Sequence, residues 1–297
     1  MAGRTRFSIA KKDIEKYFDN KKKSVYFKRE IAEILTNQRD EWRLATTTKT
    51  NDFIKLLMKS LKLKEYTFIT EDRLKKMKRY SWEEVPLYPL LQSLKSNGYI
   101  SHYSAVFIHS LTEQIPKVHY VTGEQSKKEV TNSELSQKII DESFKKETRL
   151  SNNYWFLNNE RICLLSGQNH DMLGVIDILD EDSLTAFRTT NIERTLIDIA
   201  IRPQYCGGRW EVIEAYKNAS GKVSINKLVA YLKKMKFKYP YHQCIGYYME
   251  EAGNYKESQI NLMMKIPMKY DFYLMHGMSK QYTEYSKKWR LYYPNHF

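Results

Sequence analysis

The sequence predicts an α+β protein with an N-terminal winged helix-turn-helix at residues 1–80 and a mixed α/β domain at residues 81–297. Three amphipathic helical segments followed by a short strand predict the first domain, and alternating helical and strand-like segments predict the second. The chain has 297 residues, which is long enough for two domains with buried cores. Its excess positive charge lies almost entirely in the N-terminal part.

The first two helices are predicted before residue 36. The segment Phe7–Phe18 has apolar residues, Ile9 among them, at near-helical spacing. The segment Val25–Leu35 places apolar side chains on one face and the cations Lys28 and Arg29 on the other. This distribution is typical of an amphipathic helix.

A third helix is predicted at Thr46–Leu63, with Thr48 or Thr50 as its N-cap. Its apolar residues, which include Met58, form one stripe, and its lysines lie on the other side. The next segment, Glu65–Thr70, is rich in aromatic and β-branched residues and is predicted to be a strand. Three helices followed by a strand match a winged helix-turn-helix, whose third helix enters the major groove of DNA.

The third helix and the start of the second carry the residues that we expect to contact DNA. Thr50 and Asn51 have side chains that can reach base edges, whereas the lysines are suited to phosphates. The connection from Asn37 to Thr50 is longer than the turn of a simple helix-turn-helix, so a packed helical cap is the alternative. The candidate DNA-binding residues are Lys28, Arg29, Lys49, Thr50, Asn51, Lys55 and Lys59.

Net charge separates the two predicted domains. Residues 1–80 contain 22 Lys and Arg against 11 Asp and Glu, whereas residues 81–297 contain 27 against 24. Such an excess in a small domain favours nucleic-acid binding, because cations that neutralise phosphates release condensed counterions. The alternative is a lysine-rich surface exposed to solvent. Charge and helical pattern together favour DNA binding.

Pro86 and Pro89 indicate a linker or turn after the first domain. Beyond it, short helices are predicted at Leu90–Lys95 and His102–Leu111, and a strand at Lys117–Thr122. This alternation predicts an α+β arrangement. Other segments with strand composition, the last two of which are expected to complete the sheet, are Arg161–Leu165, Gly174–Ile178, Leu184–Arg188, Asp271–Met275 and Lys288–Pro294.

The segment Asn191–Gly208 has the sharpest local pattern. Its first part predicts an apolar helix that stops at Pro203. Arg194 and Asp198 are four residues apart, so their side chains can pair across one helical turn. The two charges either form a patch that contacts a partner or pair within the protein. The surrounding apolar residues favour a buried pair.

The C-terminal third contains another predicted helix at Ser224–Lys236. The segment Tyr239–Met249 that follows is rich in aromatic residues. It is either a recognition surface or part of the core, because clustering is expected in a chain with 23 tyrosines.

The sequence contains no glycine-rich phosphate loop and no common serine, cysteine or zinc hydrolase motif. The pair His170–Asp171 and the acidic run Asp177–Asp182 are too weak as patterns to predict a metal site. Cys163, Cys206 and Cys244 are widely spaced and are expected to be reduced core thiols. We therefore expect a protein that is not an enzyme and binds no cofactor or metal.

The expected location is the cytoplasm, with no membrane partner. No apolar run in the sequence approaches the length of a membrane span. The N-terminal residues also lack the apolar core of a signal peptide.

Two stretches match one known pattern. They are Gly98–Gln125 and the run ERTLID (Glu193–Asp198) with the RP (Arg202–Pro203) and GG (Gly207–Gly208) that follow it. Together with the helix-turn-helix-like N-terminus, they resemble the AbiEi antitoxins of bacterial type IV toxin-antitoxin systems. The resemblance spans most of the chain, which departs from a compact family member in its length and in the tyrosine-rich segment after Tyr239. The most specific matches are Glu193, Arg194, Thr195, Leu196, Ile197, Asp198, Arg202, Pro203, Gly207 and Gly208.

The resemblance implies a transcriptional autorepressor whose winged helix-turn-helix binds operator DNA and whose second domain is an antitoxin. It implies a nucleotidyltransferase toxin as the functional partner, an antagonism that need not involve a stable complex, and a role in abortive phage infection. The alternative function is a nucleic-acid-processing enzyme, such as a restriction-type nuclease with a basic DNA-reading domain. A neighbouring nucleotidyltransferase gene would favour the first function, and a methyltransferase gene the second.

Overall fold

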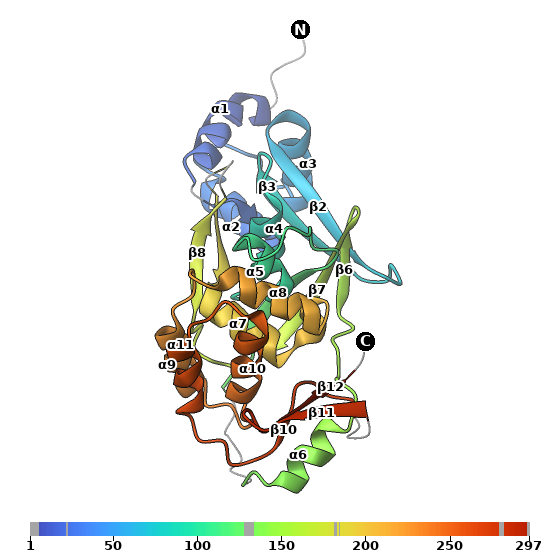
Figure 1. Ribbon diagram of the computed structural model, residues 1–297. Coiled ribbons are helices and arrows are strands. Elements are labelled where there is room, and N and C mark those ends of the chain that lie inside the picture. The colour runs from blue at the N-terminus through green and yellow to red at the C-terminus, as the bar shows by residue number, and fades with distance from the viewer. Residues whose placement is uncertain are drawn as a thin grey trace.

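The computed structural model describes residues 6–21, 23–127, 134–180, 183, 185–278 and 282–295. Within those ranges the chain forms eleven α-helices and two β-sheets, so the predicted α+β class is confirmed. Figure 1 shows the N-terminal helices at one end, the large sheet in the middle, and a small sheet with helix α6 (Gln137–Phe144) at the other end. None of the described helices is long and apolar enough to cross a membrane.

The N-terminal elements share one hydrophobic core. They are α1 (Arg6–Asp19), β1 (Val25–Tyr26), α2 (Lys28–Gln38), α3 (Thr50–Ser60), β2 (Leu63–Thr70) and β3 (Lys76–Trp82). Phe18, Phe53 and Leu57 are buried at its centre. Trp42, from the connection between α2 and α3, stacks on Phe53 with the ring centroids 5.8 Å apart. Trp42 also packs edge-on against Tyr17 of α1, so its ring links the third helix to the first.

Helix α2 begins three residues later than the sequence pattern predicts. Val25 and Tyr26 form strand β1, which pairs antiparallel with β3. Both side chains are buried, so their apolar character reflects burial in a sheet rather than a helical face. The helix starts at Lys28, and the Glu30 carboxylate accepts a hydrogen bond from the Phe27 backbone N–H at 2.8 Å.

Helix α3 is shorter at both ends than predicted. It covers Thr50–Ser60, and its N-cap is Lys49 in an extended conformation rather than a threonine. Met58 is 41% exposed, so the buried stripe is narrower than expected, and Ile9 of α1 is 62% exposed. The strand predicted at Glu65–Thr70 is confirmed within β2, which forms a hairpin with β3.

The large sheet joins the N-terminal elements to the middle part of the chain. Its strands beyond β3 are β4 (Tyr99–Ile100), β5 (His119–Glu124), β6 (Tyr154–Leu157), β7 (Glu160–Gly167), β8 (Val175–Leu179) and β9 (Ala186–Thr190). The nine strands are mixed in direction and follow the order β1-β3-β2-β6-β7-β5-β4-β9-β8. The junction between β2 and β6 is short, with Ile69 opposite Phe156 and Thr70 opposite Trp155. Residue 80 falls inside β3, and the division into two domains stays a prediction.

The strands predicted in the second half are present with shifted ends. The segment predicted at Lys117–Thr122 is β5, which starts at His119. Five of its six residues are buried, because β5 lies between β4 and β7 inside the sheet. The strand predicted at Leu184–Arg188 is β9, which begins at Ala186, and Leu184 lies outside the described residues.

Helix α7 (Ile192–Ile201) lies within a layer of helices and confirms the helix predicted in this part of the chain. Neighbouring helices enclose it, so eight consecutive residues from Glu193 to Ala200 are buried. A 3₁₀ turn at Pro203–Cys206 follows. The helices that contact α7 are α5 (His102–Ile108), α8 (Arg209–Ala219), α9 (Ile225–Met235) and α10 (His242–Ala252). The remaining helices are α4 (Leu87–Gln92) and α11 (Glu257–Met264).

The C-terminal strands form a sheet of their own, which corrects the expectation that they complete the large one. They are β10 (Phe272–Tyr273), β11 (Thr283–Ser286) and β12 (Leu291–Pro294), in the order β10-β12-β11. Trp289 packs so closely on Gly246 of α10 that a Cβ there would overlap its ring. Tyr247 and Tyr248 of α10 are buried, so this part of the aromatic segment belongs to the core.

Candidate nucleic-acid interface and interior cavity

One face of α3 presents the predicted DNA-contacting side chains to solvent. Asn51, Lys55 and Lys59 follow one another at intervals of four residues, so they share a face, and all three are exposed. Lys49 at the N-cap is also exposed, whereas Thr50 is half-buried. Within the described residues no ion pair engages the three lysines. Their charges are therefore available to phosphates.

The connection between α2 and α3 is ordered by Arg39, a residue that the sequence pattern did not single out. Its guanidinium donates hydrogen bonds to the backbone carbonyls of Ala45, Thr46 and Thr48 at 2.5, 3.1 and 3.0 Å. Trp42, in the same connection, is only 3% exposed. These contacts give the long turn a defined shape and fix where α3 begins. Backbone acceptors leave no signal in the sequence.

A groove of about 730 Å³ lies where the start of α2 meets β3 and β9. Its described lining includes five cations and no carboxylate. Only one of the five, Arg29, is predicted from the sequence, and Lys28 is exposed but does not line the groove. The five cations are Lys23, Arg29, Arg79, Lys95 and Arg188.

The five cations differ in whether other groups of the protein already bind them. Lys23 pairs with a glutamate of α2 at 2.5 Å. Arg79 is buried and donates to the Ser93 carbonyl at 2.9 Å, and burial lowers its pKa. Among the described residues no carboxylate engages the guanidinium of Arg29 or Arg188. These two arginines are the ones best placed to bind an anion.

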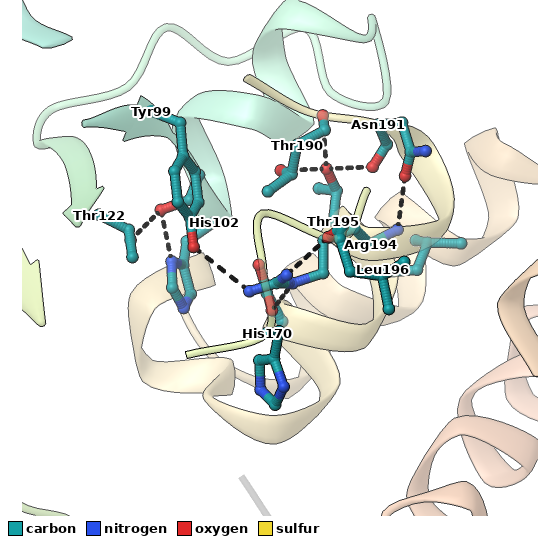
Figure 2. A network of polar contacts seen from close by, with 12 residues as sticks. Tyr99, His102, Thr122, His170, Thr190, Asn191, Arg194, Thr195 and Leu196 are labelled. Carbon is teal, nitrogen blue, oxygen red and sulfur yellow. Dashed lines mark hydrogen bonds and ion pairs between the residues drawn. The ribbon is translucent and has the colours of Figure 1, made fainter. Parts of the chain in front are cut away.

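Arg194 belongs to α7 and its side chain makes hydrogen bonds to three other residues, some of which Figure 2 shows. Its Nε donates to the Asp198 carboxylate at 2.8 Å, and its terminal nitrogens donate to the Leu173 carbonyl at 2.8 Å and the Tyr99 hydroxyl at 3.3 Å. Its side chain is 5% exposed. Burial is the largest single influence on the pKa of Arg194 and acts to lower it, but the hydrogen bond to Asp198 and the charges of Asp198, Tyr99 and Glu124 together outweigh it, so the net shift is upward. The buried pair that the sequence favours is present.

The start of α7 is fixed by a short polar network, also visible in Figure 2. The Asn191 side chain accepts a hydrogen bond from the Arg194 N–H at 3.0 Å and donates one to the Tyr231 hydroxyl at 3.0 Å. The hydroxyls of Thr190 and Thr195 lie 2.8 Å apart. Asparagine before an apolar helix is a known N-cap signal, so this role is readable from sequence.

Glu193 and the two glycines of the ERTLID, RP and GG run have structural partners or special backbone angles. Buried Glu193 accepts a hydrogen bond from the Ser224 N–H at 3.0 Å and pairs with Lys227 at 3.1 Å. Gly207 has φ +86° at the end of the 3₁₀ turn, and Gly208 has φ +104° before α8. Positive φ angles favour glycine, so these two positions shape the turn.

A cavity of about 630 Å³ lies beside α7 and the end of β7. Arg194, Asp198 and Arg202 line it, and the aromatic residues Tyr205, Phe237, Tyr239 and Tyr241 also contribute to its wall. His102 also lines it, and burial lowers the pKa of this histidine to about 4, so its ring is neutral near pH 7. No residue of α3 lines this cavity. The predicted DNA-binding and motif residues therefore lie at two separate places.

The weak metal-site patterns of the sequence do not assemble into a site within the described residues, where no group of three potential ligands occurs. Asp171 is exposed and pairs with Lys127 at 2.9 Å. The His170 ring packs edge-on against Phe237, with the ring centroids 5.3 Å apart. Glu181 and Asp182 of the acidic run lie outside the described residues.

No family model and no curated protein matches the chain. Among solved structures, the fold is similar to that in the crystal structure of RV2827C protein from Mycobacterium tuberculosis. The TM-score is 0.55 at 13% sequence identity, and the match covers 97% of this chain and 91% of that one. At this identity the likeness shows the fold alone. Its coverage extends over both the N-terminal helices and the C-terminal layers.

Proposed function

We propose that this chain is a DNA-binding transcriptional autorepressor and the antitoxin of an AbiE-like type IV toxin-antitoxin system. Its N-terminal winged helix-turn-helix binds operator DNA, and its second domain counteracts a nucleotidyltransferase toxin in phage defence. The observation that carries the DNA-binding part is the row of exposed cations along α3. Lys55 and Lys59 lie one helical turn apart there, without a carboxylate partner among the described residues.

The arrangement of the N-terminal elements supports a winged helix. Their order along the chain is α1, β1, α2, α3, β2 and β3, and the three strands pair in the order β1-β3-β2. The β2–β3 hairpin follows α3 directly and carries the basic run Arg73–Arg79. In a winged helix-turn-helix the third helix enters the major groove, and the hairpin that follows is suited to contact the phosphate backbone.

The antitoxin part of the proposal rests on the resemblance of the ERTLID, RP and GG run to the AbiEi family. In the fold this run forms the buried helix α7 and the glycine turn after it. The same run supplies Arg194 and Arg202 to one cavity, so it combines a structural role with chemistry at a concave surface.

The DNA-binding part is tested with DNA from upstream of the chain's own operon and with unrelated DNA. Replacing Lys55 and Lys59 by alanine should weaken binding to both and reduce the salt slope by about one for each lost phosphate contact. Asn51→Ala should mainly reduce preference for the operator, by about 1–3 kcal/mol for a bidentate base contact. Fluorescence anisotropy at several salt concentrations measures both effects.

Lys265→Ala serves as the control, because Lys265 is an exposed lysine at the C-terminus of α11. It should leave DNA affinity unchanged. Unaltered affinity in the Lys55 and Lys59 variants would remove α3 from the interface. Incubation of the DNA with protein and Mg²⁺ should leave it intact, and cleavage would favour a nuclease instead.

The antitoxin part is tested by growth. Cells that express the nucleotidyltransferase encoded beside this chain should stop growing, and co-expression of the chain should restore growth. A failure to restore growth at normal protein level would contradict the antitoxin part and leave the DNA measurements standing.

A further inference from the structure

The cavity beside α7 has a charge distribution that DNA binding by α3 does not use. Four cationic side chains line it, and Asp198 is the single carboxylate among the described lining residues. The Asp198 charge is already matched by Arg194 at 2.8 Å. The cavity therefore retains an excess of positive charge. The four cations are Arg149, Arg194, Arg202 and Lys238.

Two of these arginines are free to bind a ligand. In the part of the chain that the structure describes, neither Arg149 nor Arg202 makes a side-chain hydrogen bond or ion pair. Arg202 lines the cavity together with His102 and Tyr241. Arg149 is exposed, so it stands where a ligand would enter.

Aromatic rings line the same cavity. Phe237 packs edge-on against Tyr241, with centroids 5.5 Å apart, and Tyr239 and Tyr205 also contribute to the lining. A nucleobase gains stability by stacking on an aromatic side chain. The volume of about 630 Å³ is within the range of small-molecule sites and far exceeds that of one phosphate group.

We propose that this cavity binds a nucleoside phosphate, with its phosphates on Arg149 and Arg202 and its base against the wall that contains Phe237. Guanidinium groups recognise phosphate oxygens through paired hydrogen bonds, and the aromatic wall supplies an apolar surface for a planar base. The site goes beyond the proposed function. It is independent of α3, none of whose residues line it.

Isothermal titration of the full-length protein with ATP, GTP, CTP and UTP tests the proposal. At least one of them should bind with a dissociation constant in the micromolar range. Arg149→Ala and Arg202→Ala should each weaken that binding by about tenfold or more, as expected for the loss of a charge-assisted hydrogen bond. Phe237→Leu should weaken nucleotide binding and leave inorganic tripolyphosphate binding unchanged.

The matched control is the Lys55→Ala, Lys59→Ala double variant. Like the Arg149→Ala, Arg202→Ala double variant, it loses two positive charges, but these come from α3 rather than from the cavity. The α3 variant should keep its nucleotide affinity while losing DNA affinity. Should Arg202→Ala lower the melting temperature, Arg149→Ala still tests the site, because that side chain is exposed and has no described hydrogen bond or ion pair.

Three results would overturn the proposal. One is no binding of any nucleotide at millimolar concentration. Another is equal affinity for tripolyphosphate and the nucleotides, which would show an anion site without base recognition. The third is loss of nucleotide binding in the α3 double variant but not in the cavity double variant, which would place the nucleotide on the DNA-binding face.

Discussion

Arg194 is a charged side chain that the fold has made part of its core. Arg194→Ala would leave the Asp198 carboxylate buried without its partner, and breaking a buried pair in this way costs about 3–5 kcal/mol. We expect a correspondingly large loss in the free energy of unfolding, measured by urea denaturation. Loss of toxin neutralisation at unchanged stability would contradict this and assign Arg194 to a partner contact.

Lys138 and Glu142 provide the matched control for Arg194. They are also an i,i+4 pair on a helix, but their nitrogen and oxygen atoms are 4.0 Å apart and their side chains are 84% and 63% exposed. Because water screens such a pair, Lys138→Ala should cost no more than about 0.5 kcal/mol. Two pairs with the same spacing in sequence should therefore contribute very differently to the free energy of unfolding, because one is buried and the other is exposed.

His102 and His242 predict a loss of stability at mildly acidic pH. Burial lowers the pKa of each to about 4, whereas a histidine in the unfolded chain titrates near 6.5. Below about pH 6.5 the unfolded chain therefore binds protons that the folded chain does not bind. The free energy of unfolding should fall by about 1.4 kcal/mol per pH unit for each histidine as pH drops from about 6.5 toward 4.

Urea denaturation at pH 6.5, 6.0 and 5.0 measures how steeply the free energy of unfolding changes with pH, above the range where most carboxylates titrate. His102→Asn should make it shallower by the contribution of one histidine. Asparagine suits the site because His102 has φ +50°, a backbone conformation that asparagine tolerates, and its Nδ1 lies 2.9 Å from the Ser101 hydroxyl. An unchanged slope in this variant would show that His102 does not titrate as described.

At the scale of elements, the turn before α3 depends on one side chain. Arg39→Ala removes the hydrogen bonds to three backbone carbonyls between α2 and α3. The start of α3 should then exchange its amide hydrogens faster, and affinity for DNA should fall because the helix is less well positioned. Hydrogen exchange across residues 45–53 together with anisotropy measures both effects.

Arg43→Ala is the control for this turn. Arg43 lies in the same connection and is exposed. Replacing Arg43 should change amide exchange little. It should reduce DNA affinity by no more than the loss of one phosphate contact would. Equal effects of both variants would mean that charge, rather than the shape of the turn, matters at these positions.

At the scale of the whole molecule, one sheet connects the N-terminal elements to the rest. Val25 and Phe68 share a core with Leu90 and Trp155, and β2 meets β6 through two residue pairs. A fragment that starts at residue 83, after β3, should fold, because the core around α7 lies within it. It should melt at a lower temperature than the full chain, since the β6 edge and Trp155 become exposed.

The same fragment should still neutralise the toxin while losing repression, because α3 is removed and α7 is retained. Growth on toxin co-expression and a reporter fused to the operon's promoter measure the two activities separately. Rescue that requires residues 1–82 would show that the two activities are not divided between the two parts of the chain.

Local features of the sequence were sufficient to predict several elements. The cores of α1, α2, α3 and α7 follow from apolar residues at helical spacing, which is a property of neighbours along the chain. The pairing of Arg194 with Asp198 follows from their separation of four residues. The end of α7 follows from Pro203, since proline cannot continue a helix.

Tertiary structure alone decided which segments meet. Strand β1 is a strand because β3 lies beside it, and the last strands form their own sheet because they pair with each other. The hydrogen bonds of Arg39 end on backbone carbonyls, which every sequence contains. The cavity combines residues from His102 to Tyr241, and only the folded chain brings them together. Spacing along the chain specifies local conformation, whereas burial, pairing and cavities depend on contacts between segments distant in sequence.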